Sequence, residues 1–301
     1  MKQELNPCGH WKLRHFEPGC GEEQRAFSSH FCDTGWLVAT VPGDVHLDLE
    51  RAGMIPDPFY AANAEECRWI EKQEWWYKRQ FTVPSELIRQ PAKLVFEGLD
   101  CFAIIWLNDE RLGEHQDMFV SCEFDASGRL REMNTLAARL DSPRRAVADK
   151  DVTELTASHK ERIYARNCQM GYGWDFAPRL VTVGIWRPVR LLFLDRVAIE
   201  DVFVQTEMED AGAAQVQAEI TLSAYLEKPA TISLELDLSP ANFSGQGLSA
   251  AAWQLTLSQG RRKWCGRPYT WRKRGSGILT PWGIPTSTGC GSGRWQGTSI
   301  G

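Results

Sequence analysis

The sequence predicts an all-β protein built from two successive β-sandwich domains. A series of short β-prone segments separated by turns fills most of the first two hundred residues. Apolar and polar residues then alternate in the region that begins near Val197, as in antiparallel strands with one buried face. The length of 301 residues allows one large domain or two ordinary ones, and 43% hydrophobic residues is ordinary for a soluble globular protein. Helical patterns are confined to residues 44–51 and parts of residues 144–162.

The first domain, residues 1–195, is expected to be a jelly-roll β-sandwich. Its clearest strands are residues 75–83 (WWYKRQFTV), 93–99 (KLVFEGL), 101–107 (CFAIIWL) and 187–194 (RPVRLLFL). Asn108 and Asp109 follow the third of these, and both residue types tolerate positive φ. We therefore expect a tight hairpin at this pair. Regular short strands of this kind are typical of sandwiches and jelly rolls.

The second domain, residues 196–258, is expected to be an incomplete immunoglobulin-like sandwich. Its predicted strands are residues 199–206, 215–226 and 231–238. Residues 259–301 form an irregular tail without apolar periodicity, and no acidic residue follows Asp237. A flexible basic tail is one explanation. The explanation we prefer is a reading frame that slips after about Ser258.

Composition and motif spacing exclude several classes of function. A net charge of −5 without a dominant basic block gives no support for a nucleic-acid or membrane-surface partner. No apolar run approaches a membrane span, and the polar amino terminus does not resemble a secretory signal, so we expect a cytoplasmic protein. The nine cysteines form no CxxC pair and predict reduced thiols. The scattered histidines predict no metal site, and we expect no cofactor.

One aromatic-rich segment, residues 169–190, is the strongest candidate for a functional site. It places Trp174, Phe176 and Trp186 around a single acidic residue, Asp175. Ring faces stack on the C–H faces of sugars, and a carboxylate accepts hydrogen bonds from sugar hydroxyls. The alternative is a structural loop whose tryptophans belong to the core. The thirteen tryptophans of the chain fit either interpretation.

Three motifs in order resemble the amino-terminal part of β-mannosidases of glycoside hydrolase family 2. They are VPGDVHLDLERAGMIPDPFYAANAEECRWIEKQEWWYKRQF (residues 41–81), LVFEGLDCFAIIWLNDERLGEHQDMF (94–119) and GWDFAPRLVTVGIWRPVRL (173–191). The resemblance covers roughly residues 11–237. It implies a galactose-binding-like jelly roll to about residue 195, followed by an immunoglobulin-like sandwich.

In that family a (β/α)₈ barrel follows and carries two catalytic glutamates for retaining hydrolysis of terminal β-mannose, with carboxyls about 5 Å apart. No barrel pattern is present in this sequence. Glu65, Glu66, Glu71 and Glu74 lie in a linker-like segment, where we expect a solvated charged face. We therefore expect that the chain alone does not hydrolyse glycosides, and we predict no catalytic residue in it.

The resemblance implies that Asp175 is a buried carboxylate that binds hydroxyls of a β-mannoside or oligosaccharide, with Trp174 beside it. Phe176 and Ala177 stand where the family's loop has tryptophan and glycine, so the indole N–H is lost. Arg179 could pair with Asp175 or with another carboxylate, as could Arg187.

Other interpretations of the same residues remain open. The chain could be a stand-alone carbohydrate-binding module or a scaffold domain that binds no sugar, and full-length relatives could be homodimers. Residues 42–44 and 55–58 are interpreted as plain turns closed by proline and aspartate. His46 is interpreted as a structural histidine.

Overall fold

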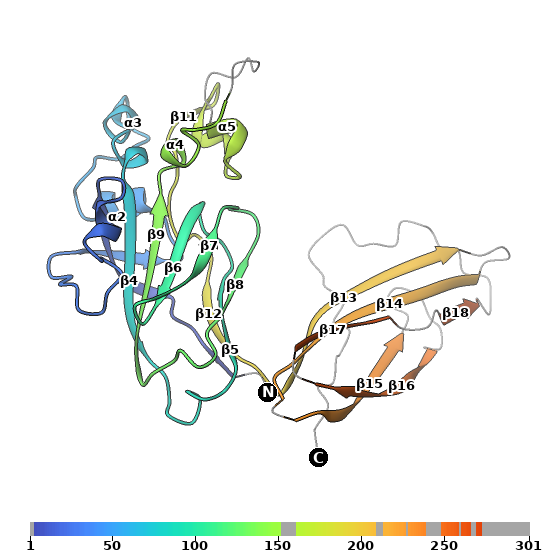
Figure 1. Ribbon diagram of the computed structural model, residues 1–301. Coiled ribbons are helices and arrows are strands. Elements are labelled where there is room, and N and C mark those ends of the chain that lie inside the picture. Colours follow the sequence, from blue (N-terminus) through green and yellow to red (C-terminus); the bar gives the residue numbers. More distant parts are fainter. Residues whose placement is uncertain are drawn as a thin grey trace. The chain divides into compact units, whose positions relative to one another are not determined.

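The computed structural model describes residues 3–151, 161–208, 213–226, 228–238, 248–258, 260–265 and 269–272. The chain divides into two compact units, Met1–Leu194 and Asp195–Gly301 (Figure 1). Strands dominate both units, and the helices described are short. This confirms the all-β prediction.

Unit 1 is a sandwich of two antiparallel sheets. The six-stranded sheet has the order β3-β2-β4-β9-β6-β7. Its strands are β2 (Gly9–Phe16), β3 (Leu37–Val41), β4 (Glu74–Thr82), β6 (Phe102–Leu107), β7 (Glu110–His115) and β9 (Met133–Asp141). The four-stranded sheet has the order β1-β12-β5-β8, with β1 (Gln3–Leu5), β5 (Ala92–Phe96), β8 (Cys122–Asp125) and β12 (Val189–Phe193). This two-sheet arrangement is the predicted jelly-roll sandwich.

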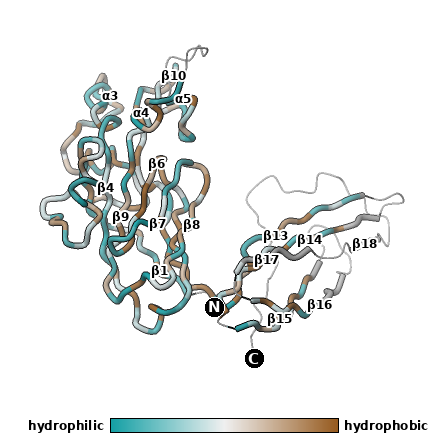
Figure 2. Tube along the Cα trace, in the orientation of Figure 1, coloured by the Kyte–Doolittle hydropathy of each residue, from teal (hydrophilic) through white to brown (hydrophobic). Residues whose placement is uncertain are grey.

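The core of unit 1 lies between the two sheets. Leu13, Tyr77 and Ile105 of the six-stranded sheet are fully buried in one cluster with Leu94 and Leu191 of the four-stranded sheet. Hydrophobic stretches accordingly run along the strands of this unit in Figure 2. Alternation along each strand sends one set of side chains into this layer, which explains why the strand pattern was readable from the sequence.

The predicted strands around residue 100 belong to different sheets. β5 pairs with β12, whereas β6 pairs with β9, so the chain crosses between the two sheets at Asp100 and Cys101. Asp100 also forms an isolated bridge with Gly184. Asn108 and Asp109 adopt φ values of 52° and 72°, which confirms the predicted hairpin between β6 and β7.

Helices occupy the connections of unit 1. They are α1 (Cys20–Glu23), α2 (Val45–Arg51), α3 (Asn63–Glu66), η1 (Ile70–Lys72), α4 (Pro143–Ala146), α5 (Glu161–Tyr164) and η2 (Gln169–Gly171). α2 is the helix predicted at residues 44–51, and the Asp44 carboxylate caps it by accepting the His46 backbone N–H at 2.8 Å. α4 and α5 confirm helix in parts of 144–162, although residues 152–160 lie outside the described residues. No helix in the described part of the chain is long and apolar enough to cross a membrane.

A second cluster, on the other side of the six-stranded sheet's strands, accounts for several tryptophans. Trp36, Trp76 and Trp106 are buried there with Phe16, and the rings of Trp76 and Trp106 stack with centroids 5.0 Å apart. Phe27 stacks on Trp106 at 5.3 Å. Much of the tryptophan content is thus explained by packing rather than by ligand binding.

Unit 2 consists of strands that pair in two groups. β14 (Ala213–Ala224) pairs with β13 (Val197–Met208), β17 (Gly260–Cys265) and β18 (Tyr269–Arg272), while β15 (Ala230–Leu238) pairs with β16 (Leu248–Leu257). Seven apolar side chains of these strands and their connections are buried in one cluster: Ile220, Leu222, Ala224, Leu226, Ile232, Leu234 and Leu257. The strand prediction is therefore confirmed, while the immunoglobulin-like topology stays a prediction.

β17 and β18 fall within residues 259–301, where the sequence predicted an irregular tail. Both pair with β14 through the main chain, from Glu219↔Cys265 to Ala224↔Gly260 in the case of β17. Main-chain pairing does not require an apolar period, so sequence periodicity does not reveal such a strand. The rest of that range, together with the proposed frame slip, lies outside the described residues.

Candidate functional site

The aromatic segment folds into a short hairpin. β10 (Tyr172–Trp174) pairs with β11 (Ala177–Arg179), and Asp175 and Phe176 form the turn between them. Gly173 has a φ of 96°, which a residue with a Cβ adopts only with strain. The hairpin lies near α3, α4 and α5 at one end of unit 1 (Figure 1).

The turn residues project into solvent. Trp174 is 50% exposed and Phe176 is 72% exposed, so these two rings are not core residues. Asp175 is exposed as well, which corrects the prediction of a buried carboxylate. The reason is the two-residue turn, because a tight reversal leaves no neighbouring chain to cover its central side chains. Asp175 and Trp174 are nonetheless adjacent, as the predicted site requires.

A buried ion pair holds the base of the hairpin. The Arg179 guanidinium donates from Nε and Nη2 to the Glu71 carboxylate at 3.1 and 3.0 Å. The same guanidinium lies 5.4 Å from the ring centroid of Tyr172. Arg179 thus pairs with a carboxylate other than Asp175. Glu71 follows Ile70 in η1, so the pair ties β11 to a segment more than a hundred residues away.

The prediction that four glutamates lie on a solvated face is wrong for Glu71 and Glu74, which are buried. Glu65 and Glu66 are exposed, as expected. Glu71 is 9% exposed and Glu74 is fully buried. The Glu74 carboxylate accepts hydrogen bonds from the Gly19 and Gly21 amides at 2.7 and 2.8 Å. These donors compensate the loss of water around the buried charge.

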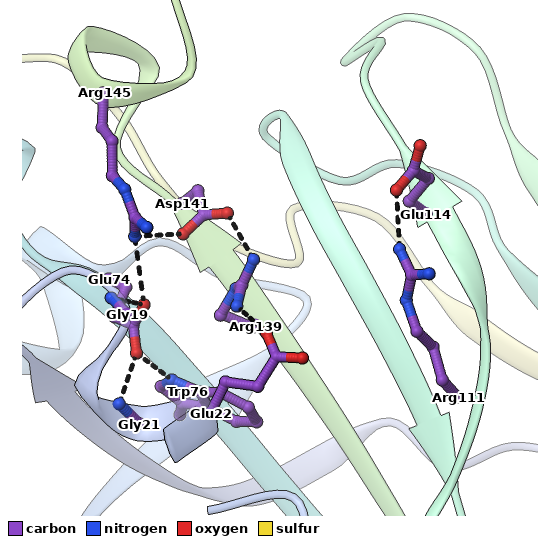
Figure 3. A network of polar contacts seen from close by, with 10 residues as sticks. All are labelled: Gly19, Gly21, Glu22, Glu74, Trp76, Arg111, Glu114, Arg139, Asp141 and Arg145. Carbon is purple, nitrogen blue, oxygen red and sulfur yellow. Dashed lines mark hydrogen bonds and ion pairs between the residues drawn. The ribbon is translucent and has the colours of Figure 1, made fainter. Parts of the chain in front are cut away.

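Figure 3 shows how this carboxylate connects to α4. Glu74 also accepts from Trp76 Nε1 at 2.9 Å, and Arg145 Nη1 lies 3.7 Å from its Oε2. Arg145 reaches Asp141 at 3.8 Å, and Asp141 accepts from Arg139 at 2.8 Å. Burial raises the pKa of Asp141, against the lowering effect of Arg139. The network is structural, because each of these carboxylates is held by protein donors.

An open cavity of about 1180 Å³ lies beside the hairpin. Trp174 and Tyr172 contribute aromatic surface to its wall. Six basic side chains and two acidic ones also line it: Arg68, Lys72, Arg144, Arg145, Arg162, Arg179, Glu71 and Glu161. Asp175 and Phe176 do not line the cavity. The turn therefore lies at the rim of the cavity, and the cavity itself is a separate, positively charged surface.

The remaining predicted residues lie elsewhere or serve the fold. Arg187 stacks on Trp186 at 4.3 Å and does not pair with Asp175. Trp186 Nε1 donates to the Met118 carbonyl at 3.2 Å. His46 is buried with its Nδ1 2.9 Å from Asp44 Oδ1, which supports the structural interpretation.

The two proline-rich turns are plain loop geometry. Asp44 Oδ2 accepts the Val183 amide at 3.0 Å, and Asp57 accepts the Phe59 amide at 2.9 Å in an Asx-turn. Asp100 is buried nearby and accepts the Thr182 hydroxyl at 2.5 Å. Burial raises the pKa of Asp100 to about 7, in spite of the hydrogen bond from Thr182.

The described side chains offer no metal centre. Among them there is no group of three or more histidine, cysteine, aspartate or glutamate residues placed to hold an ion. The cysteines of unit 1 are free thiols: Cys8, Cys20, Cys32, Cys67, Cys101, Cys122 and Cys168.

The jelly-roll sandwich of unit 1 is the architecture of a galactose-binding-like domain. Residues 11–187 match the family described as glycosyl hydrolase 2 galactose-binding domain-like, and the chain belongs to this family. β-Mannosidase B of Emericella nidulans is 28% identical over 240 residues, which cover 70% of this chain and 28% of that protein. β-Mannosidase B of Thermothelomyces thermophilus is 30% identical over 233 residues, which cover 73% of this chain and 26% of that protein.

A solved structure gives the same result. The crystal structure of β-D-mannosidase from Dictyoglomus thermophilum matches with a TM-score of 0.71 and 29% identity. The match covers 90% of this chain and 31% of that chain. These matches confirm the resemblance inferred from the motifs. The chain spans between a quarter and a third of the length of these three relatives.

The sequence pattern predicted the turn as a candidate site but did not predict the cavity. The basic side chains come from four segments, around Arg68, Arg144, Arg162 and Arg179, and only the fold brings them together. No run or period connects them, so the sequence held no signal for the cavity. The Glu71–Arg179 pair was equally hidden, since its partners are 108 positions apart.

Proposed function

We propose that this chain is the sugar-binding accessory part of a β-mannosidase-like glycoside hydrolase and does not hydrolyse glycosides by itself. The observation that carries the proposal is the β10–β11 turn, which presents Trp174, Asp175 and Phe176 to solvent. Membership of the family and the names of the relatives support the substrate class, a β-mannoside.

The chemistry of the turn fits a weak sugar site. An ionised carboxylate accepts hydrogen bonds from two vicinal hydroxyls, and charged acceptors make stronger bonds than neutral ones. The exposed ring of Trp174 offers a face for the C–H groups of a pyranose. Because Asp175 is exposed, water competes for the same bonds, and we expect dissociation constants in the millimolar range, about −4 kcal/mol of binding free energy.

The absence of hydrolysis is proposed from the state of the nearby glutamates. A retaining glycosidase needs two carboxyls about 5 Å apart that are free to exchange protons with the substrate. Glu71 is held by Arg179, and Glu74 by two backbone amides and an indole. Neither is available to protonate a leaving group. The catalytic pair is therefore proposed to lie in the part of the enzyme that these relatives have beyond the matched region.

Three further assignments belong to the proposal. Unit 2 is proposed to be an immunoglobulin-like sandwich that extends beyond the predicted residues 196–258, because β17 and β18 pair with β14. The protein is proposed to be cytoplasmic, which the free thiols of unit 1 support. A homodimer is proposed only for full-length relatives. Its test is the mass of a full-length version in solution.

Calorimetry on the purified chain tests sugar binding. We expect millimolar binding of β-1,4-mannobiose, loss of that binding in Asp175→Ala, and weakening in Trp174→Ala. Asp201→Ala is the matched control, since Asp201 is an exposed aspartate of β13 in unit 2. No release of nitrophenol from 4-nitrophenyl β-mannoside is expected from any of these proteins.

The competing functions give different outcomes. A stand-alone carbohydrate-binding module would bind the sugar at micromolar rather than millimolar concentration. A scaffold domain would bind no sugar, and that result would contradict the proposal for the isolated chain. If Asp175→Ala still binds the sugar, the turn is not part of the binding site.

A further inference from the structure

The cavity beside the hairpin carries an excess of positive charge that the fold does not require. Six of its lining side chains are basic and two are acidic, whereas the whole chain has a net charge of −5. A concave surface lined by one sign of charge concentrates ligands of the opposite sign. The cavity is thus the part of the described surface where an anion would gather against the overall charge.

Three of the cations serve the structure. Arg179 is bound to Glu71 by hydrogen bonds of 3.0 to 3.3 Å. Arg68 pairs with Glu65 at 2.6 Å, and Arg145 lies 3.7 Å from the carboxylate of Glu74. Their charges are at least partly compensated, so they do not by themselves call for a ligand.

The other three cations have no such partner. In the described part of the chain, no carboxylate lies within ion-pair distance of Lys72, Arg144 or Arg162. Glu71 is already engaged, and the second lining carboxylate, Glu161, is only 7% exposed. Among the described residues, these three cations therefore have no carboxylate partner, and the lining of the cavity keeps an excess of positive charge.

An aromatic face lies directly beside this charge. The Arg162 guanidinium is 4.7 Å from the ring centroid of Trp174, and half of the Trp174 side chain remains exposed. Tyr172 also lines the cavity and is 4% exposed. A ring face suits the C–H face of a sugar, and arginine forks suit a carboxylate. The volume of about 1180 Å³ exceeds that of most pockets for drug-sized ligands and is sufficient for a disaccharide.

We propose that this cavity binds an anionic saccharide, a sugar unit that carries a carboxylate. The sugar ring lies against Trp174, and the carboxylate is bound by Lys72, Arg144 and Arg162. The inference deepens the proposed function and rests on it for the position of the sugar at Trp174. It adds a charge requirement that a neutral mannoside does not meet.

A pair of ligands with the same skeleton tests the charge requirement. β-1,4-Mannobiose and β-1,4-dimannuronate differ in the oxidation of the C6 hydroxymethyl groups to carboxylates. In calorimetry on the full chain at low salt we expect dimannuronate to bind at least about fivefold more tightly, the upper range of one exposed ion pair. This advantage should shrink in 0.5 M NaCl, because salt screens exposed charges.

Substitutions locate the charge effect. Lys72→Gln, Arg144→Gln and Arg162→Gln should each reduce the preference for dimannuronate over mannobiose about two- to fivefold. Arg14→Gln is the matched control, since Arg14 is exposed and its guanidinium lies 5.1 Å from the Phe16 ring, outside the cavity. Circular dichroism checks that each variant is folded.

Inorganic phosphate separates a sugar site from a simple anion site. Phosphate should compete with dimannuronate only weakly. Phosphate that binds as tightly as dimannuronate would overturn the inference, as would equal affinities for the two disaccharides or a preference unchanged in the three cavity variants. Mannobiose binding that depends on Asp175 without any dimannuronate preference would refute this inference alone. A dimannuronate preference without an effect of Asp175→Ala would instead refute the proposed role of the turn.

Discussion

Substitution of Glu71 by glutamine should destabilise unit 1 by about 3 kcal/mol. Removal of one partner of a buried ion pair leaves an uncompensated charge and costs about 3–5 kcal/mol. The side chains of Glu71 and Arg179 are 9% and 13% exposed, so some water reaches the arginine and the lower end of that range applies. Glutamine keeps the shape of the side chain, which separates the charge effect from a packing defect.

Glu65→Gln is the control for this prediction. The Arg68–Glu65 pair is as short as the Arg179–Glu71 pair, at 2.6 against 3.0 Å, but both of its side chains are largely exposed. An exposed pair of this kind contributes less than about 1 kcal/mol. Urea unfolding followed by tryptophan fluorescence measures both variants, and hydrogen exchange at the amides of β10 and β11 shows whether the hairpin opens locally. Equal losses in the two variants would refute the role assigned to burial.

Two further predictions follow from the titratable groups. Burial raises the pKa of Asp100 to about 7 from its ordinary 3.8, so the folded protein holds this proton more tightly than the unfolded chain does. The resulting stability is complete below pH 3.8 and is lost as the pH rises through 7. Relative to Asp100→Asn, the wild-type free energy of unfolding should therefore fall by up to about 4 kcal/mol between pH 4 and pH 8, and parallel urea curves for the two proteins would contradict this. Cys32 is exposed, and its hydrogen bond with Thr34 lowers the pKa of its thiol, whereas burial raises that of Cys101. Iodoacetamide should thus label Cys32 well before Cys101 in the native chain, as peptide mass spectrometry can measure.

The strands and turns of unit 1 could be predicted because their signals are local. Asn108 and Asp109 predicted a tight hairpin with positive φ, and the structure confirms both. The helical pattern over residues 44–51 likewise predicted α2. Such features depend on a few consecutive residues, so no knowledge of the tertiary fold was needed.

The burial of charged residues could not be predicted in that way. Glu74 looked like one more carboxylate in a charged segment, yet the Gly19 and Gly21 amides come from 53 to 55 positions away to solvate it. The prediction for Asp175 was wrong in the opposite direction, because this carboxylate is exposed rather than buried. The family resemblance implied a buried carboxylate that binds sugar hydroxyls, whereas the described fold leaves the Asp175 side chain exposed to water.

The pairing of β1 with β12 sets the order in which unit 1 can be completed. Gln3 lies opposite Phe193, so β1, the first strand of the unit, can pair only after β12, the last strand, is present. While a ribosome synthesises the chain, β1 has no partner until residues 189–193 have emerged, and until then one edge of β5 also stays unpaired. Sheets with such distant pairings fold slowly, on a scale of milliseconds to seconds. The hairpin β10–β11 can form early, but the sandwich that supports it is complete only after β12 has been synthesised and has paired.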